Sequence, residues 1–306
     1  MSRFASRRAR RATIGRCAVL VIASIGWPLV ASASHITDTD DFAEVVATAL
    51  DYADQVGPER VLVVLDIDNT LLAMNRPLGS DQWFEWQRYL LEHHPNSSDC
   101  VADSFEGLLE AQGLLYNLAR MHPPQNDLPL LVRELQGRGI RTLVLTSRGP
   151  EFRIATEREL RRNGYDFARS ALRPHNVPDG NYLPYDLEDP EADGLTKDEL
   201  SDLGLNEAKP ISYENGIMMT AGQNKGAMLL TMLHDTRDDF DAVVYDDDNI
   251  RHVAFVFGAL TGRDREITAF HYTREEANMK EFQYGDKEDV TERWHKLNDV
   301  LEEVLE

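Results

Sequence analysis

Two carboxylates, Asp66 and Asp68, follow directly on the apolar run Val61–Leu65. Residues two apart on an extended chain point to the same side, so both acids face the same space where the predicted strand ends. Like charges this close are costly unless a cation or a shared proton compensates them. The pair therefore indicates a charged functional position. The alternative is an acidic turn, because Asp and Asn favour turns after strands.

A second acidic cluster, Asp246, Asp247 and Asp248, follows the apolar run at 242–245. Three successive carboxylates at the end of a buried strand repel one another, and a hard divalent cation with oxygen ligands relieves that repulsion. Mg²⁺ typically binds one or two carboxylates together with phosphate oxygens, so we predict a Mg²⁺ site here. A solvated acidic loop is the alternative interpretation.

Two further polar positions lie at the ends of predicted elements. Thr146 and Ser147 close the apolar run at 140–145, where a hydroxyl either contacts a ligand or caps the next helix. Asn224 is a predicted helix cap, which places Lys225 in the first turn, where a cation opposes the helix dipole. An anion facing Lys225 would explain this placement, although an exposed lysine is also tolerated there.

The elements that must hold these residues alternate between strand and helix. Unbroken apolar runs are typical of strands buried on both faces of a parallel sheet, and they lie at 61–65, 140–145, 242–245 and 267–271. Helical spacing predicts helices at 42–53, 128–135, 152–160, 227–233, 253–260 and 290–305, the first capped by Thr37, Asp38 or Thr39. We therefore expect an α/β fold with a doubly wound, mainly parallel sheet flanked by helices. Ligands in such sheets bind at the carboxyl ends of the strands, where these polar residues fall.

Two segments do not fit the alternation. Residues 76–123 contain helical patterns near 83–91 and 101–118, and we interpret them as a small helical cap insertion. Its aromatic residues continue a helical stripe, which favours packing over a lid that stacks on a ligand. Residues 165–215 are rich in Pro, Gly and acids, so we expect a long surface excursion.

The first 33 residues differ in composition from the rest of the chain. They contain six arginines and no acid, then an apolar stretch at 17–30 and the small residues Ala31, Ser32 and Ala33. These are the parts of a secretory signal peptide. We expect cleavage near Ala33 and an exported, periplasmic mature protein, with an uncleaved N-terminal anchor as the alternative.

The net charge of the chain and its few cysteines and histidines exclude some classes of function. Residues 34–306 hold 26 basic and 53 acidic residues, a net charge of −27, which leaves no basic footprint for nucleic acid or an anionic membrane. We therefore expect no nucleic-acid partner and no stable membrane contact after cleavage.

Cys100 would be the single thiol of the mature chain, and His93, His94 and His252 have no neighbouring metal ligands in the sequence, so we expect these histidines to be satisfied or exposed side chains. The oligomeric state is left open.

Together, the four polar motifs resemble those of the haloacid dehalogenase (HAD) superfamily of aspartate-nucleophile phosphatases. The similarity spans residues 61–260 and rests on Asp66-Ile67-Asp68-Asn69-Thr70, then Thr146, Lys225 and the acidic cluster, in that order. An exported chain with Asn224-Lys225-Gly226 before a helix is most similar to a bacterial branch of unknown substrate. The substrate class that the resemblance implies is a small phosphate ester.

The resemblance also implies a role for each site residue. Asp66 would attack phosphorus, and Asp68 would protonate the leaving alkoxide while its main-chain carbonyl helps to hold Mg²⁺. Thr146 would bond a phosphoryl oxygen, and Lys225 would neutralise charge and orient Asp66. Asp248 would bind the ion directly and Asp247 through water. This register is uncertain by one residue, because Asp246 stands where the family has an apolar side chain.

Two other functions remain open at this stage. A receiver-like phosphoacceptor also uses acids, Thr and Lys on a doubly wound sheet, but its paired acids come first in the chain, whereas here a single acid motif leads and the cluster closes. A catalytically silent binding or scaffold protein of the same fold is the other alternative. The carboxylate at Asp68 favours ester hydrolysis, since the resemblance implies that members which only transfer phosphate within themselves, or which displace halide, lack an acid there.

Overall fold

The computed structural model describes residues 34–236 and 238–305. The predicted signal peptide at 1–33 lies outside these residues. Among the helices of the described part, none is long and apolar enough to cross a membrane.

The centre of the fold is an eight-stranded sheet. Its strands lie side by side in the order β1-β10-β9-β2-β5-β8-β7-β6. The first six of these strands pair in parallel, and β7 and β6 add antiparallel at one edge. Their bounds are β1 His35–Thr39, β2 Val61–Leu65, β5 Arg141–Thr146, β6 Asn181–Tyr182, β7 Ile211–Glu214, β8 Ile217–Met219, β9 Ala242–Asp247 and β10 Glu266–Tyr272. The predicted α/β fold with a mainly parallel sheet is confirmed.

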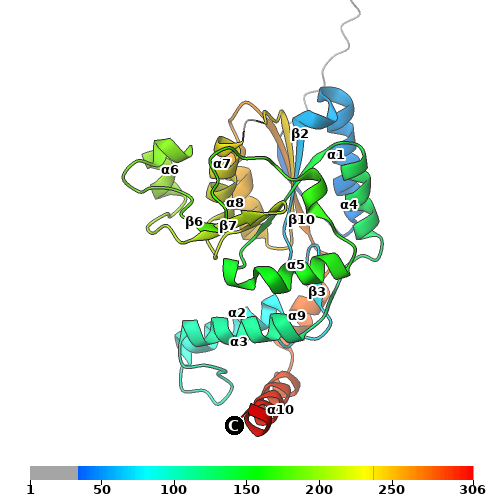
Figure 1. The fold of residues 1–306 in the computed structure, drawn as a ribbon. Coiled ribbons are helices and arrows are strands. Elements are labelled where there is room, and N and C mark those ends of the chain that lie inside the picture. Colours follow the sequence, from blue (N-terminus) through cyan, green and yellow to red (C-terminus); the bar gives the residue numbers. More distant parts are fainter. Residues whose placement is uncertain (1–33, 237, 306) are drawn as a thin grey trace, which may run out of the picture. The chain divides into compact units, whose positions relative to one another are not determined.

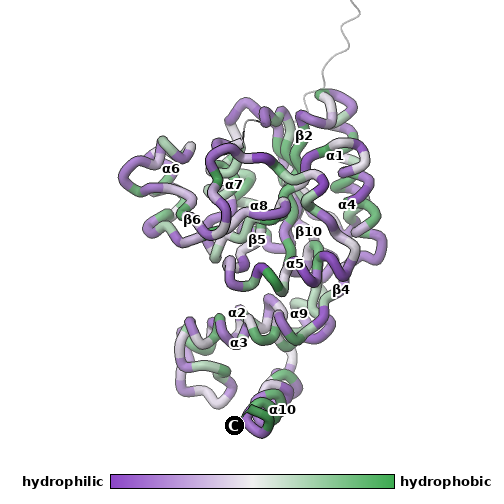
Figure 2. Tube along the Cα trace, in the orientation of Figure 1, coloured by the Kyte–Doolittle hydropathy of each residue, from purple (hydrophilic) through white to green (hydrophobic). Residues whose placement is uncertain are grey.

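Helices cover both faces of this sheet (Figure 1). Those that pack on it are α1 Phe42–Val56, α4 Leu128–Gly137, α5 Arg153–Arg162, α7 Lys225–Asp235 and α8 Ile250–Leu260. Every residue of β2 is buried, because one face of the strand meets α1 and α4 and the other meets α7 and α8. Figure 2 shows the hydrophobic residues along β2, with polar residues on the outer turns.

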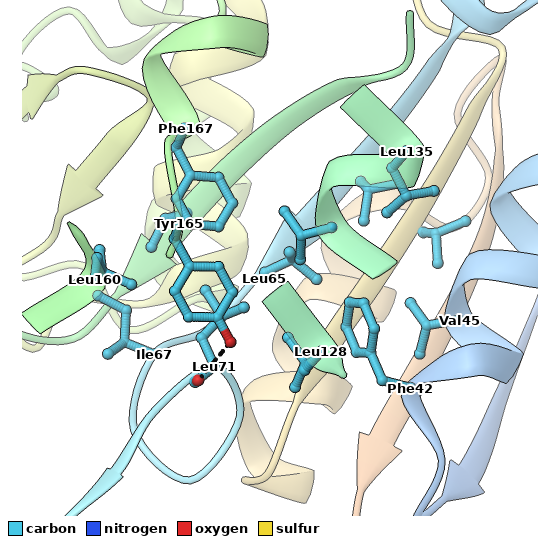
Figure 3. Close-up of a cluster of buried hydrophobic side chains, with 14 of the residues drawn as sticks. Phe42, Val45, Leu65, Ile67, Leu71, Leu128, Leu135, Leu160, Tyr165 and Phe167 are labelled. Carbon is cyan, nitrogen blue, oxygen red and sulfur yellow. Dashed lines mark hydrogen bonds between the residues drawn. The ribbon is translucent and has the colours of Figure 1, made fainter. Parts of the chain in front are cut away.

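The hydrophobic cluster on the α1 and α4 face of the sheet also includes residues of the loop that carries the first acids. Phe42 of α1 and Leu128 of α4 pack with Leu65, Ile67 and Leu71 (Figure 3). The hydroxyl of Tyr165 also donates a hydrogen bond to the carbonyl of Leu71 at 2.9 Å. The residues on either side of Asp66 are therefore fixed by the core.

The start of α1 differs from the prediction. Thr37, Asp38 and Thr39 do not cap the helix but lie in β1, which pairs in parallel with β10. The helix cap is Asp41, whose side chain accepts a hydrogen bond from the N–H of Ala43. The strand pairs with residues more than 200 positions away, so local sequence signals for a cap misled the prediction.

The inserted helices between β2 and β5 are α2 Asp81–His93 and α3 Phe105–Leu118, above a two-stranded ribbon of β3 Ala73–Met74 and β4 Met121–His122. We call residues 76–123 the cap. It packs against a C-terminal segment made of α9 Glu276–Tyr284 and α10 Glu288–Leu305. Trp83 of α2 and Trp294 of α10, for example, have ring centroids 6.4 Å apart. Trp83, Phe84 and Trp86 of α2 pack in this cluster, as expected from their helical stripe, whereas Tyr89 is exposed and stacks on His93.

The segment at 165–215 is not only a surface excursion. It contributes β6, β7 and the short helix α6 Lys197–Asp202, together with the 3-10 turns at Phe167–Ser170 and Pro190–Asp193. Leu172, Tyr185 and Leu195 are buried against α7 and the sheet. The expectation was wrong because its proline and acid content hides single buried residues at irregular spacing. The remaining 3-10 turns are Pro58–Arg60 and Pro150–Phe152.

Candidate active site and metal centre

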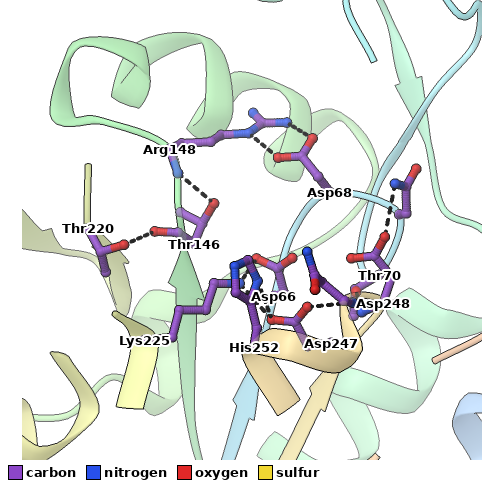
Figure 4. Close-up of polar contacts among 12 residues, drawn as sticks. Asp66, Asp68, Thr70, Thr146, Arg148, Thr220, Lys225, Asp247, Asp248 and His252 are labelled. Carbon is purple, nitrogen blue, oxygen red and sulfur yellow. Dashed lines mark hydrogen bonds and ion pairs between the residues drawn. The ribbon is translucent and has the colours of Figure 1, made fainter. Parts of the chain in front are cut away.

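The polar residues singled out in the sequence converge at the carboxyl ends of β2, β5 and β9 (Figure 4). Asp66 follows β2, Thr146 ends β5 and Asp247 ends β9. The strands β2 and β9 are neighbours, and the N–H of Asp66 bonds the carbonyl of Asp246 at 3.0 Å. Sheet register therefore brings the first acidic motif against the last one, although 180 positions separate them.

Lys225 faces two anions, as its place in the first turn of α7 suggested. Its ammonium lies 2.7 Å from Oδ1 of Asp66 and 2.7 Å from Oδ2 of Asp247, and its side chain is fully buried. Asn224 caps the helix by accepting bonds from the N–H groups of Gly226 and Ala227. Burial alone would lower the pKa of Lys225, but the two carboxylates outweigh it and raise that pKa. The lysine is thus a fixed, charged bridge between the two acids.

Asp66, Asp247 and Asp248 form a buried group that could hold a metal ion, which we call the acid triad. One oxygen from each carboxylate lies within 4.8 Å of the others. Burial raises the pKa of Asp66 to about 6 against the opposing charge of Lys225, and it raises the pKa of Asp248 well above the usual value. Three carboxylates share this space with one lysine, so a further cation would relieve the repulsion between them.

Asp247 is held more firmly than the other two acids. Lys225 and the hydroxyl of Tyr245 bond its Oδ2, and the N–H of Asn249 bonds its Oδ1 at 2.8 Å. His252, which we expected to be a satisfied or exposed side chain without ligand neighbours, places Nδ1 3.4 Å from the same Oδ2. Burial would raise the pKa of Asp247, but Lys225 and His252 lower it below the usual value.

Asp248 is positioned by the loop that carries the first motif. Asn69 donates its side-chain amide to Oδ2 of Asp248 at 3.0 Å, and Thr70 accepts the N–H of Asp248 at 3.0 Å. Asn69 has a φ of 57°, a left-handed conformation that Asn tolerates better than most residues. The Asn-Thr pair after Asp68 therefore fixes the two acidic loops to each other.

Asp246 does not belong to the triad. Successive side chains of a strand point to opposite faces, so Asp246 lies on the other face of β9 from Asp247. It is fully buried, and neither carboxylate oxygen has a hydrogen-bond partner within the described part of the chain. Burial and the neighbouring acids raise its pKa well above the usual value. Among the three successive acids, Asp247 and Asp248 therefore belong to the group that could hold a metal ion, and Asp246 does not.

Residues 37–306 match the family described as "Protein of unknown function (DUF2608)". The chain belongs to the DUF2608 family. No curated protein and no solved structure matches it. The matched residues include the whole acid triad and Lys225, so the site lies within the part that defines the DUF2608 family.

Asp68 and Thr146 lie beside the triad in this DUF2608 chain but make different contacts. The carboxylate of Asp68 is bound by Arg148, whose Nη2 and Nε donate to its two oxygens at 2.7 and 2.8 Å. Thr146 is buried, and its hydroxyl accepts the N–H of Arg148 at 3.2 Å while its carbonyl accepts the hydroxyl of Thr220 at 2.9 Å. Arg148 therefore links the end of β5, where Thr146 lies, to Asp68 in the loop after β2.

Sequence reasoning missed four polar residues of the DUF2608 site: Arg148, Asp81, Tyr245 and His252. Arg148 lies two residues after β5 and Tyr245 two residues before the end of β9, close to the strand ends that drew attention to Thr146 and the acidic cluster. Asp81 begins α2 of the cap, and burial, Asp68 and Glu85 raise its pKa to about 8. No local pattern in the sequence indicates that the first residue of an inserted helix faces acids at the end of β2.

Proposed function

We propose that this protein is a Mg²⁺-dependent phosphomonoester hydrolase of the HAD type, with Asp66 as its nucleophile. The observation that carries the proposal is the buried ammonium of Lys225, 2.7 Å from both Asp66 and Asp247 and beside a third carboxylate. Phosphoryl transfer needs an in-line nucleophile and fixed positive charge for the oxygens of the transferred group. A nucleophilic acid, a lysine and a candidate cation site that lie together and are buried match those needs.

The donor set of the triad suits Mg²⁺, which prefers carboxylate oxygens and keeps room for phosphate or water. Asp247 already accepts hydrogen bonds at both oxygens, whereas Lys225 bonds Oδ1 of Asp66 and Asn69 bonds Oδ2 of Asp248. We therefore assign Asp66 and Asp248 as direct ligands, Asp247 as a ligand through water and the carbonyl of Asp68 as a further ligand. Bound Mg²⁺ would neutralise negative charge on the phosphoryl group.

The reaction then proceeds in two displacements by the chain's own residues. A carboxylate oxygen of Asp66 bonds to phosphorus as the ester P–O bond breaks. Asp68, protonated from solvent at its partly exposed carboxyl group before the first turnover, gives that proton to the departing alkoxide. Asp68 next takes a proton from water, which attacks the aspartyl phosphate and releases inorganic phosphate while Asp66 is regenerated. Thr146 donates its hydroxyl to a phosphoryl oxygen, and Lys225 keeps Asp66 oriented.

The substrate class that fits is a small phosphate ester, because Asp66, Thr146 and Lys225 are buried and only the side chain of Asp68 is partly exposed. The acidic surface of residues 34–306 supports the absence of a nucleic-acid partner. Export to the periplasm, with or without cleavage near Ala33, is also part of this proposal.

The test is a panel of phosphate esters incubated with the purified protein, with Mg²⁺ or with chelator. We expect turnover that chelator abolishes and that Asp66→Asn lowers by at least about 10³-fold. Asp246→Asn is the matched control, because it changes a buried acid of the same cluster outside the triad, and it should retain turnover. Full activity in Asp66→Asn would refute the mechanism. Silence of the wild type on all esters would favour a binding or scaffold role.

A further inference from the structure

Arg148 is the most completely bonded side chain next to the acid triad, and the proposed chemistry assigns it no role. Its side chain is 3% exposed. Nε and Nη2 bind the two oxygens of Asp68, and Nη1 donates to the hydroxyl of Thr156 at 2.9 Å. Such a parallel, bidentate pair fixes direction as well as distance, which a single ammonium cannot do.

Three elements outside the sheet hold the guanidinium in place. Thr156 belongs to α5, and the sulfur of Met121 in β4 lies 3.4 Å from Nη2. From the cap, the ring of Tyr116 in α3 covers the guanidinium, with its centroid 4.0 Å from Cζ. An arginine held this way from several sides is a rigid support for whatever it binds.

Asp68 needs such a support because of the charges around it. Asp66 stands two residues before it, and Asp81 of the cap is close enough for Asp68 to raise the pKa of Asp81. Repulsion from the ionised carboxylate of Asp66 favours conformations in which the carboxylate of Asp68 turns away from it, toward solvent. The pair with Arg148 opposes that movement and keeps the carboxylate, whose side chain is 15% exposed, at the mouth of the site.

We infer that Arg148 is a positioning residue, which holds the carboxylate of Asp68 where the departing and attacking oxygens pass. The inference rests on the proposed phosphatase function and adds a residue to it. Arg148 acts only through Asp68, because all three of its guanidinium nitrogens bind protein groups. It therefore contributes to the rate of the chemical steps and not to the affinity for substrate.

The test is a double-mutant cycle of Arg148→Lys and Asp68→Asn, with kcat and KM measured on the best ester of the panel. Arg148→Lys should lower kcat by about 10- to 100-fold and change KM by less than about threefold. In the Asp68→Asn background the same substitution should change kcat by less than about twofold, since its target is gone. Additive effects, or a KM that rises in both backgrounds, would show that Arg148 binds substrate directly and would overturn the inference.

A matched control separates positioning from a general loss of structure. Arg153 of α5 is also a mostly buried arginine, bonded to Ser212 and Glu157 at 2.7 and 3.2 Å. Arg153→Lys should lower the melting temperature as much as Arg148→Lys does but leave kcat unchanged. An equal loss of kcat in both variants would reduce Arg148 to a structural residue. Turnover that is missing in the wild type overturns the proposed function itself, whereas an active wild type with additive variants overturns only this inference.

Discussion

At the scale of single residues, three consecutive aspartates occupy three different environments. The carboxylate of Asp246 is buried and has no hydrogen-bond partner among the described residues, Asp247 is bonded at both oxygens, and Asp248 is held by Asn69. The alternation of side chains along β9 separates the first from the second, and the end of the strand separates the second from the third. Three residues of the same type are therefore a buried acid with a raised pKa, a carboxylate bonded at both oxygens and a candidate metal ligand.

The raised pKa of Asp81 can be tested through the pH dependence of protein stability, without an activity assay. Its pKa is raised to about 8 by burial, Asp68 and Glu85. Between its usual pKa near 4 and about 8, the folded protein binds a proton that the unfolded chain lacks, so stability falls as pH rises through this window. Asp81→Asn removes that loss. We expect the variant to match the wild type near pH 4 and to become progressively more stable toward pH 8, by at most about 1.4 kcal/mol per pH unit.

The measurement is urea unfolding at several pH values in chelator, which removes divalent cations as a variable. Asp198→Asn, an exposed acid at the start of α6, is the control and should leave the pH dependence unchanged. Parallel stability curves for Asp81→Asn and the wild type would contradict the raised pKa.

At the scale of elements, the sequence predicts the buried strands and their ends well. The runs at 61–65, 140–145 and 242–245 predict buried parallel strands, and the polar residues after them predict the site, because both signals are local. Pairing between distant segments is not local: β1 forms its hydrogen bonds with β10, more than 200 residues away. Nothing in residues 35–39 distinguishes such an edge strand from a helix cap.

One missed element did carry a usable signal. Asn215-Gly216 connects β7 to β8, with φ values of 54° and 79°. Asn-Gly between two short strands is the preferred sequence of a tight hairpin, because both positions need a left-handed backbone. The dipeptide lies at the end of the proline-rich segment, whose composition drew attention away from it.

The packing of the cap against α10 predicts that these helices are stabilised together and separately from the sheet. Trp294 is 7% exposed and packs against Trp83 of the cap, so Trp294→Ala should cost about 3–5 kcal/mol of local packing. Because α10 contacts the cap rather than the sheet, we expect faster amide hydrogen exchange in α2, α3 and α10, with β2 and β9 still protected. Val300→Ala on the exposed side of α10 is the control and should change little. Uniform loss of protection would show instead that α10 supports the whole fold.

At the scale of the whole molecule, the site must attract an anion to a protein whose described part is strongly acidic. Residues 34–306 carry a net charge of −27, which repels phosphate esters over distances longer than the pocket. Lys225 and Arg148 lie inside and are paired, so they do not offset this field at a distance.

Added salt should therefore help the reaction. Screening shortens the range of the repulsion from about 30 Å at 0.01 M to about 8 Å at 0.15 M ionic strength. We expect kcat/KM for a phosphate dianion to rise severalfold over this range at constant free Mg²⁺, while kcat stays nearly constant. Steady-state rates at a series of sodium chloride concentrations measure it. A falling kcat/KM would mean that a local positive field steers the substrate.

The C-terminal segment comes after every strand in the sequence, yet it completes the packing of helices inserted directly after β2. During synthesis on the ribosome, the aromatic side of α2 therefore emerges long before Trp294 exists to cover it. A nascent chain that stalls before residue 276 would contain all eight strands of the central sheet and the acid triad, while the tryptophans of α2 would lack their C-terminal packing partners. Chaperones and quality-control proteases recognise exposed hydrophobic surface of this kind.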